Sequence, residues 1–276
     1  MKMKRTSIAL ILVSALVLLV IALPAVAEES SRSDVLPVYV NGLLDTKCVL
    51  VNGQAYTTAD EMASVYGIDG SGWYDLETGD SEFSGENLLI QYHGGNQYCT
   101  VNGRYLYMPE GIIEVEGVAY YPLRVLAKVF GIGLTWNADL RGIELDTSKM
   151  ALLESGDSYY GSHEQDLLAR IIWAESGNQP FEGMIAVGNV VLNRVASERF
   201  PNSVHDVVYQ AGQFDPVRNG SINNTPSDDA VLASYLCLEG VNTVGDALFF
   251  QNPSSSGVIF SGLTYIATIG DHVFYR

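Results

Sequence analysis

The sequence predicts an α+β protein with an N-terminal module of two ββα-type units and a mainly helical C-terminal domain with a small β portion. Three observations support this. A segment near the N-terminus repeats at an offset of 64 residues, a stretch rich in glycine, serine and aspartate follows it, and apolar residues then recur at helical spacing. We expect the repeat module over 37–147, a linker over 148–162 and the helical domain over 163–276.

The repeat aligns Val51–Ile68 with Val115–Ile132, and a tryptophan follows each copy, Trp73 and Trp136. Asn-Gly and Glu-Gly pairs between β-branched residues supply the positive φ values of tight hairpins. Each copy should therefore fold as two strands around such a turn, then a short helix, a glycine stop and a strand opened by the tryptophan.

In the second copy, Pro122 suits the first turn of the helix and Gly131 should end it. The run 115–127, followed by Gly131 and Thr135–Asn137, resembles the copper amine oxidase N-terminal-like domain. The resemblance implies a binding or scaffolding role at the cell surface, and a spacer without a ligand is the alternative. It implies no copper, because the region contains a single histidine, His93.

The first 27 residues have the pattern of a secretory signal. A basic start precedes an apolar run over Ser7–Leu23, and Ala25–Ala27 forms a small-residue cleavage site. An uncleaved membrane anchor is the alternative, because the run approaches the length that spans a bilayer. Either interpretation places the rest of the chain outside the cytoplasm, secreted or at the cell wall.

Acidic residues dominate the chain, with 32 aspartates and glutamates against 15 lysines and arginines and a formal net charge of −17. Without residues 1–27 the charge becomes −20. Such a surface repels nucleic acid and anionic lipid, so we expect neither as a partner. Binding to an anionic wall would need specific contacts rather than long-range attraction.

The three cysteines, Cys48, Cys99 and Cys237, show no zinc-type spacing. An oxidising compartment permits a Cys48–Cys99 disulfide, and three buried free thiols are the equal alternative.

One glutamate of the helical domain is a candidate catalytic acid. Ser162–Gln165 has the pattern of a capping box, an apolar stripe runs over Leu167–Ala174, and Glu175 follows on the face of that stripe before Gly177. Partial burial and the negative end of the helix dipole should raise the pKa of Glu175. A carboxyl that stays protonated near neutral pH can donate its proton to a glycosidic oxygen. A solvated glutamate at a frayed helix end is the alternative.

The run Leu168–Arg194 resembles the signature of cell wall hydrolases related to the spore-cortex-lytic enzymes SleB and CwlJ, and the resemblance extends over 163–276. It implies a fold like lysozyme and the lytic transglycosylases, Glu175 as the single acid and base, no cofactor or metal, and peptidoglycan glycan strands as the substrate. Spore cortex and vegetative wall are both open as substrates, and an accessory or inhibitor protein is unknown.

Matched polar and aromatic positions are expected to bind substrate: Gln213, Phe214, Phe250, Asn252 and Tyr275. The aromatic ones could equally fill the core. Asn193 and Arg194 could orient Glu175 or pair locally. No second carboxylate stands out, and the candidates for one are Glu182, Asp206, Asp215 and Asp271.

Two rival functions remain open. A zinc amidase could use His163, His205 and His272 with Glu175, although their spacing matches no compact metal motif. A wall-binding protein on a degenerate catalytic domain is the second rival, which the intact surroundings of Glu175 disfavour.

Overall fold

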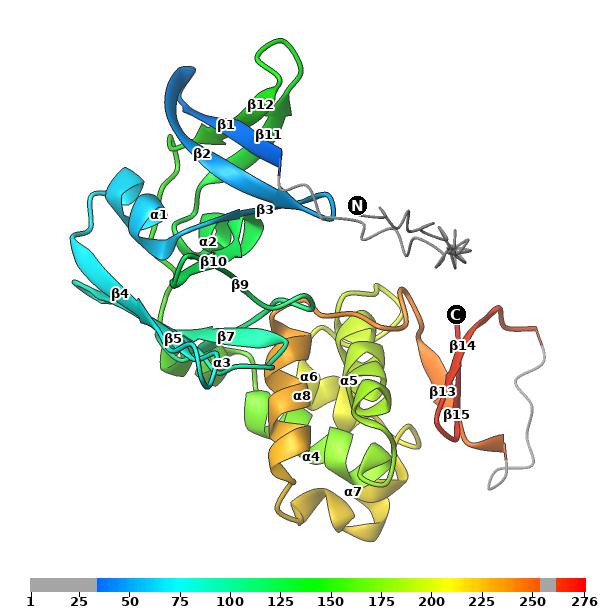
Figure 1. The fold of residues 1–276 in the computed structure, drawn as a ribbon. Helices are drawn as coiled ribbons and strands as arrows, with labels where there is room; N and C mark the ends of the chain where they lie inside the picture. Colours follow the sequence, from blue (N-terminus) through cyan, green and yellow to red (C-terminus); the bar gives the residue numbers. More distant parts are fainter. Residues whose placement is uncertain (1–33, 254–261) are drawn as a thin grey trace, which may run out of the picture. The chain divides into compact units, whose positions relative to one another are not determined.

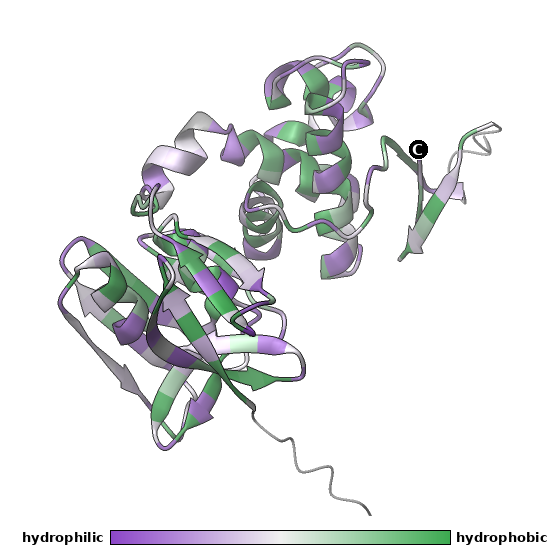
Figure 2. Cartoon of the chain, turned by 90° about the horizontal axis from the view of Figure 1, so that it is seen from above, coloured by the Kyte–Doolittle hydropathy of each residue, from purple (hydrophilic) through white to green (hydrophobic). Residues whose placement is uncertain are grey.

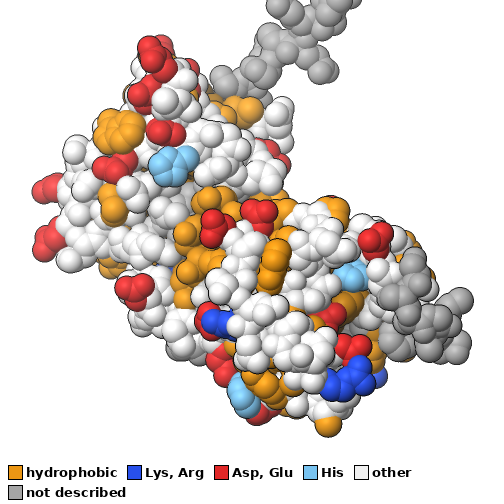
Figure 3. Space-filling model, turned by 90° about the horizontal axis from the view of Figure 1, so that it is seen from below, with side chains coloured by type: hydrophobic (Ala, Val, Ile, Leu, Met, Phe, Trp, Pro, Cys, Tyr) orange, Lys and Arg blue, Asp and Glu red, His pale blue; other side chains and the backbone are white. Residues whose placement is uncertain are grey.

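The structure is a computed structural model that describes residues 34–253 and 262–276 (Figure 1). The predicted signal over 1–27 lies outside these residues. Strands dominate up to residue 146 and helices dominate from residue 156, so the α+β class is confirmed. In the described part, no helix has both the length and the apolar character to cross a membrane. Acidic side chains are scattered over the face drawn in Figure 3, as the composition predicts.

Two sheets form the N-terminal part. A seven-stranded sheet has the order β11-β12-β1-β2-β3-β10-β9, and a five-stranded sheet has the order β4-β5-β6-β7-β8. Neighbouring strands are antiparallel except for β1 and β12, which are parallel. The elements are β1 (Asp34–Val40), β2 (Leu43–Val51), β3 (Gln54–Thr57), α1 (Ala59–Tyr66), β4 (Gly70–Tyr74), β5 (Ser81–Gly85), β6 (Leu88–Tyr92), β7 (Tyr98–Val101), β8 (Arg104–Tyr107), β9 (Ile113–Val115), β10 (Val118–Pro122), α2 (Leu123–Val129), β11 (Gly133–Asn137) and β12 (Gly142–Asp146).

The turn chemistry agrees with the sequence. The pairs at 41–42, 52–53, 102–103 and 116–117 have positive φ at both residues and join consecutive strands. Helix α1 begins with a capping box between Thr58 and Glu61 and ends at Gly67, whose φ is 87°. Helix α2 is followed by Gly131 with a φ of 61°, so both glycine stops are confirmed.

Two details of the repeat differ from the prediction. Trp73 and Trp136 do not open their strands, because each is the fourth of five residues in β4 and β11. The strands begin earlier because pairing with β5 and β12 extends back to Gly70 and Gly133. Pro122 is the last residue of β10 and precedes the first turn of α2 rather than lying in it.

All three cysteines are free and buried, so the Cys48–Cys99 disulfide is absent and the buried-thiol alternative is confirmed. Cys48 lies on β2 of one sheet and Cys99 on β7 of the other, and both belong to the core of the N-terminal part. Burial raises the pKa of Cys48 to about 11 and that of Cys99 to about 12, which keeps both thiols protonated and unreactive.

The C-terminal part combines helices with a small sheet. Helix α5 is buried along most of its length and forms the centre of the domain, as its apolar sequence predicts. Figure 2 shows hydrophobic and hydrophilic residues alternating along these helices. The elements are α3 (Gly156–Ser162), α4 (Gln165–Ser176), α5 (Phe181–Val195), α6 (Val204–Val208), α7 (Asp215–Asn219), the 3-10 helix η1 (Ser221–Asn223), α8 (Asp228–Leu238) and a sheet of β13 (Phe249–Gln251), β15 (His272–Tyr275) and β14 (Tyr265–Ile269), in that order.

The predicted capping box at 162–165 is wrong. Ser162 is the last residue of α3, which lies in the stretch expected to be a linker, and α4 begins at Gln165. Glu164 precedes α4 in the left-handed conformation and makes no side-chain cap. Helix α3 forms because Tyr160 is buried and its hydroxyl accepts a hydrogen bond from the backbone N–H of Tyr105.

A buried carboxylate joins several of these elements. The side chain of Glu239, directly after α8, is 1% exposed. It pairs with Arg104 of β8 and with Lys128 of α2, where Nζ lies 2.8 Å from Oε2, and it accepts a hydrogen bond of 2.9 Å from the Tyr160 hydroxyl. Two cations and a hydroxyl thus compensate for the burial of this charge.

Candidate active site

Helix α4 places Glu175 at the edge of the helical core. Leu168, Ile171 and Ile172 on the same helix are fully buried, and Glu175 is half-buried in the last turn. The hydroxyl of Ser176 donates a hydrogen bond of 2.6 Å to the carbonyl of Ile172. The end of the helix is therefore held in place by a buried contact, as the predicted position of the carboxyl requires.

The pKa of the Glu175 carboxyl is raised from 4.5 to about 7. Burial is the largest cause, because it disfavours the charged form. The negative charge of Asp215 raises the pKa further, and the positive charge of Arg194 lowers it. The predicted direction and its main cause are confirmed, and the side chain can carry a proton at neutral pH.

A groove of about 720 Å³ opens beside Glu175. It brings together the end of α4, one residue of α5, the loop before α7 and the small sheet. Its lining residues are Glu175, Asn178, Gln179, Arg194, Gly212, Gln213, Phe214, Asp215, Phe249, Phe250, Gln251, Asn252 and His272. A groove of this size lies in the range of small-molecule and saccharide sites.

Arg194 of α5 is the buried cation of this groove. Its Nε donates a hydrogen bond of 2.8 Å to the carbonyl of Leu248, and its guanidinium lies 5.2 Å from the ring centroid of Phe214 and 5.7 Å from that of Phe249. Burial lowers the pKa of Arg194 to about 10, so the group stays charged at neutral pH. Asn193 points elsewhere and donates to the carbonyls of the loop at 245–247.

The structure brings four of the five predicted substrate-binding residues to the groove: Gln213, Phe214, Phe250 and Asn252. Tyr275 does not line it. The Tyr275 ring is buried, and its hydroxyl accepts a hydrogen bond of 3.2 Å from Nε2 of Gln251, which does line the groove. Tyr275 therefore supports a neighbour of the site from below the surface.

His272 is a groove residue that the sequence suggested only as a zinc ligand. It is buried, its ring centroid lies 5.3 Å from that of Phe250, and burial lowers its pKa. Its Nδ1 has no hydrogen-bond partner among the described residues. A neutral histidine in this place can exchange a hydrogen bond with a bound molecule or a water, and no pattern in the sequence marked it.

A backbone clasp holds this histidine beside α5. Oε1 of Gln179 accepts a hydrogen bond of 2.8 Å from the N–H of Asp271, and the turn before it is made by Gly270 with a φ of 57°. A Cβ on Gly270 would lie 2.3 Å from Oε1 of Gln179. The turn between β14 and β15 therefore requires glycine, and it fixes the sheet against the start of α5.

Of the four candidate second carboxylates, only Asp215 lines the groove with Glu175. Asp215 is exposed at the start of α7 and forms an ion pair of 2.8 Å with Arg218. Asp206 pairs instead with His205, and Asp271 accepts a hydrogen bond from Gln179.

The described residues contain no group of three or more histidine, cysteine, aspartate or glutamate side chains that could hold a metal ion. His163 ends α3 with its ring on Tyr159, and His205 lies on α6 beside Asp206, so neither lines the groove. The three histidines of the amidase hypothesis are not brought together.

Comparison with known families identifies two segments. Residues 178–275 match the family Cell Wall Hydrolase, and residues 38–145 match the family Copper amine oxidase N-terminal domain. The first match begins three residues after Glu175.

Curated relatives match the C-terminal part. The spore cortex-lytic enzyme of Bacillus cereus is 35% identical over 119 residues, which are 42% of this chain and 46% of that protein. The spore cortex-lytic enzyme of Bacillus subtilis is 32% identical over 116 residues, which are 42% of this chain and 38% of that protein. The chain thus spans less than half the length of these relatives.

Among solved structures, the catalytic domain of the germination-specific lytic transglycosylase SleB from Bacillus anthracis is 31% identical, with a TM-score of 0.41. The match covers 45% of this chain and all of that chain. The catalytic domain of Bacillus cereus SleB is 33% identical over 42% of this chain and 91% of that chain, with a TM-score of 0.40.

Proposed function

We propose that this chain, whose residues 178–275 belong to the cell wall hydrolase family, cleaves the glycan strands of peptidoglycan outside the cytoplasm. The observation that carries the proposal is a glutamate with a pKa of about 7 in a groove large enough for sugars. The relatives named spore cortex-lytic enzymes support peptidoglycan as the substrate and make spore cortex one form of it.

The reaction follows from one carboxyl group. Glu175 donates its proton to the glycosidic oxygen, the bond from that oxygen to C1 breaks, and positive charge develops on the sugar ring. The Glu175 carboxylate then removes the proton of the muramic C6 hydroxyl, whose oxygen bonds to C1 and closes a 1,6-anhydro ring. Arg194 stabilises the carboxylate between the two steps, because its positive charge favours the ionised form.

The groove supplies contacts for the sugars. Gln213 and Asn252 offer amide groups to hydroxyl and acetamido groups, and Phe214 and Phe250 form an apolar wall with ring centroids 6.5 Å apart. Tyr275 acts through Gln251, whose side chain it holds. These roles place the leaving oxygen beside Glu175 without a metal or cofactor.

Asp215 supports hydrolysis as a second outcome. Its carboxylate lines the same groove, is exposed to solvent and acts on Glu175 through its charge. An inverting hydrolase uses a second carboxylate to activate water on the opposite face of the sugar. Products with reducing ends would therefore assign Asp215 as the base.

The remaining organisation of the chain is proposed from the sequence. Residues 1–27 direct export or anchor the chain, residues 37–147 arose from a duplicated unit, and residues 163–276 form the catalytic domain. The repeat match over 38–145 supports the second assignment. Neither nucleic acid nor anionic lipid is a partner, in keeping with the net charge of −17.

The test is digestion of purified peptidoglycan, with and without muramic-lactam, followed by mass spectrometry of the products. Glu175→Gln should abolish product formation, and the exposed Glu198→Gln should leave it unchanged. Anhydro-muramic ends that disappear in Glu175→Gln would support the transglycosylase. Free stem peptides, or equal products from both variants, would overturn the proposal.

A further inference from the structure

A second groove, of about 710 Å³, lies in the repeat module on the inner face of the seven-stranded sheet. Leu36 of β1, Leu134 of β11 and Ile143 of β12 belong to its floor. Trp136 stands directly opposite Ile143 in the strand register, on the same face of the sheet. The Trp136 side chain is nevertheless 58% exposed, so it forms an open rim to an apolar floor.

The other repeat carries an equivalent tryptophan without an equivalent groove. The two copies align at an offset of 64 residues up to Gly67 and Gly131, but Trp73 and Trp136 are 63 residues apart. A shift of one residue turns a side chain to the opposite face of a strand. Trp73 accordingly lies opposite Glu82, on the face away from the buried Phe83.

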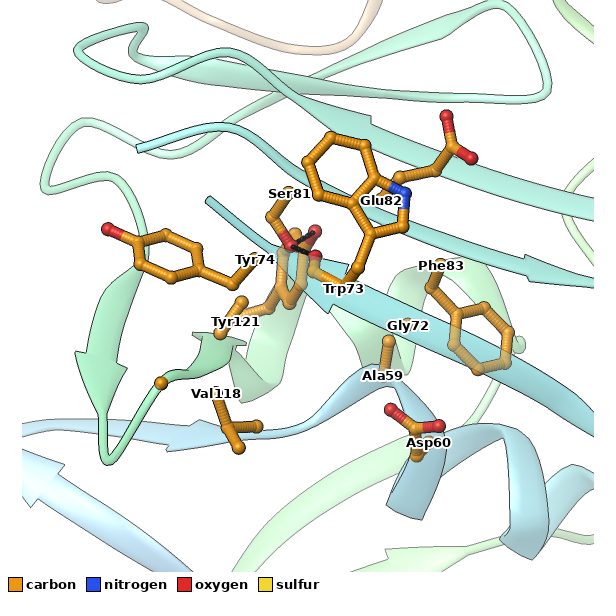
Figure 4. Close-up of a pocket in the computed structure, with 12 residues that line it drawn as sticks. Ala59, Asp60, Gly72, Trp73, Tyr74, Ser81, Glu82, Phe83, Val118 and Tyr121 are labelled. Atoms are coloured by element: carbon orange, nitrogen blue, oxygen red, sulfur yellow. Dashed lines mark hydrogen bonds between the residues drawn. The ribbon is translucent and has the colours of Figure 1, made fainter. Parts of the chain in front are cut away.

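Figure 4 shows the Trp73 ring and Glu82 extending to the same side of the strands. The hollow beside them holds only about 70 Å³. Trp73 is 52% exposed, close to the 58% of Trp136, so the two residues match in type, exposure and strand position. They differ in the space available for a ligand.

The lining of the larger groove has the chemistry of a saccharide site. Trp136 and Tyr107 are exposed aromatic rings, and the C–H faces of pyranose rings pack on such surfaces. Asn52, Gln54 and Thr135 offer uncharged hydrogen-bonding groups for hydroxyl and acetamido groups. The methyl of an acetamido group fits the apolar floor.

The charge of the groove also favours a saccharide. Glu110 and Arg124 are its two charged residues, and their charges cancel. A neutral lining gives no attraction for a polyanion, and the net charge of −17 opposes one. A stem peptide, with several ionised groups close together, would require charged partners that this lining does not provide.

We propose that the groove beside Trp136 binds the N-acetylated glycan of the cell wall, as a second site on the polymer that the first groove cleaves. The choice of polymer rests on the proposed function. Two sites on one chain raise the local concentration of the glycan at Glu175, because the second contact becomes intramolecular. The volume of about 710 Å³ lies within the range of small-ligand sites.

The test is a calorimetric titration of the purified protein, carrying Glu175→Gln to prevent cleavage, with peptide-free tetrasaccharides of the glycan. Trp136→Ala should remove one binding event or weaken it at least about tenfold, as loss of a central aromatic anchor does. Trp136→Phe keeps a ring and should retain most of the binding. Trp73→Ala is the matched control and should bind as the parent does.

The outcomes separate this proposal from the proposed function. Unchanged binding in Trp136→Ala, equal loss in Trp73→Ala, or competition by free stem peptides would overturn the second site. Product formation by Glu175→Gln is measured in the digestion and would overturn the cleavage reaction instead. Thermal unfolding of both tryptophan variants checks their folding, and these exposed side chains should contribute little to it.

Discussion

Replacing Glu175 by glutamine should stabilise the folded protein while it abolishes activity. The fold raises the pKa of this carboxyl from 4.5 to about 7, mainly by burial. Between these pH values the folded state holds a proton that the unfolded state has released. The free energy of unfolding therefore falls as pH rises through this window and stays lower above it.

The magnitude follows from the pKa shift. At about 1.4 kcal/mol for each pKa unit, the ionised carboxyl costs the folded state about 3 kcal/mol at pH 8 and about 1 kcal/mol at pH 5. Glutamine has nearly the same shape and no charge, so Glu175→Gln removes this cost. The expected gain in stability is thus large at pH 8 and small at pH 5.

Urea unfolding of both proteins at pH 5 and pH 8 measures the effect. The control is Glu198→Gln, an exposed site whose substitution should change stability by no more than about 0.5 kcal/mol at either pH. A Glu175→Gln variant that is equally or less stable than the parent at pH 8 would refute the reasoning, because it would mean that Glu175 is ionised at no cost.

Three further predictions concern the site and its support. Removing the Asp215 charge with Asp215→Asn should lower the pKa of Glu175, so the fall of kcat/KM on the alkaline side, expected near pH 7, should move to lower pH; an unmoved profile would contradict the coupling. Glu239→Gln leaves buried Arg104 without its counter-charge and should cost about 3 kcal/mol in urea unfolding, less at high salt if Lys128 dominates instead. Gly188→Ala places a Cβ 2.7 Å from the sulfur of Cys237 and should cost about 1–3 kcal/mol, read as a lower Tm; an unchanged Tm would show that the core yields.

The local signals of this sequence were sufficient for the elements that depend on neighbouring residues. The hairpin turns, the glycine stops after α1 and α2, the buried course of α5 and the raised pKa of Glu175 all follow from short-range patterns. Each depends on backbone conformation or on the apolar face of one helix, and both are encoded within about a dozen residues. The family resemblance added the four predicted groove residues that the structure brings to Glu175.

Tertiary structure alone decided which distant groups meet. Arg194 and Asp215 set the pKa of Glu175 from other elements, and His272 reaches the groove because Gln179 clasps the turn at Gly270. The capping box at 162–165 failed because burial of Tyr160 extends a helix to Ser162. The faces of Trp73 and Trp136 depend on strand register. Long-range pairing and burial fix all of these, and they are energies of contacts between segments that no local pattern contains.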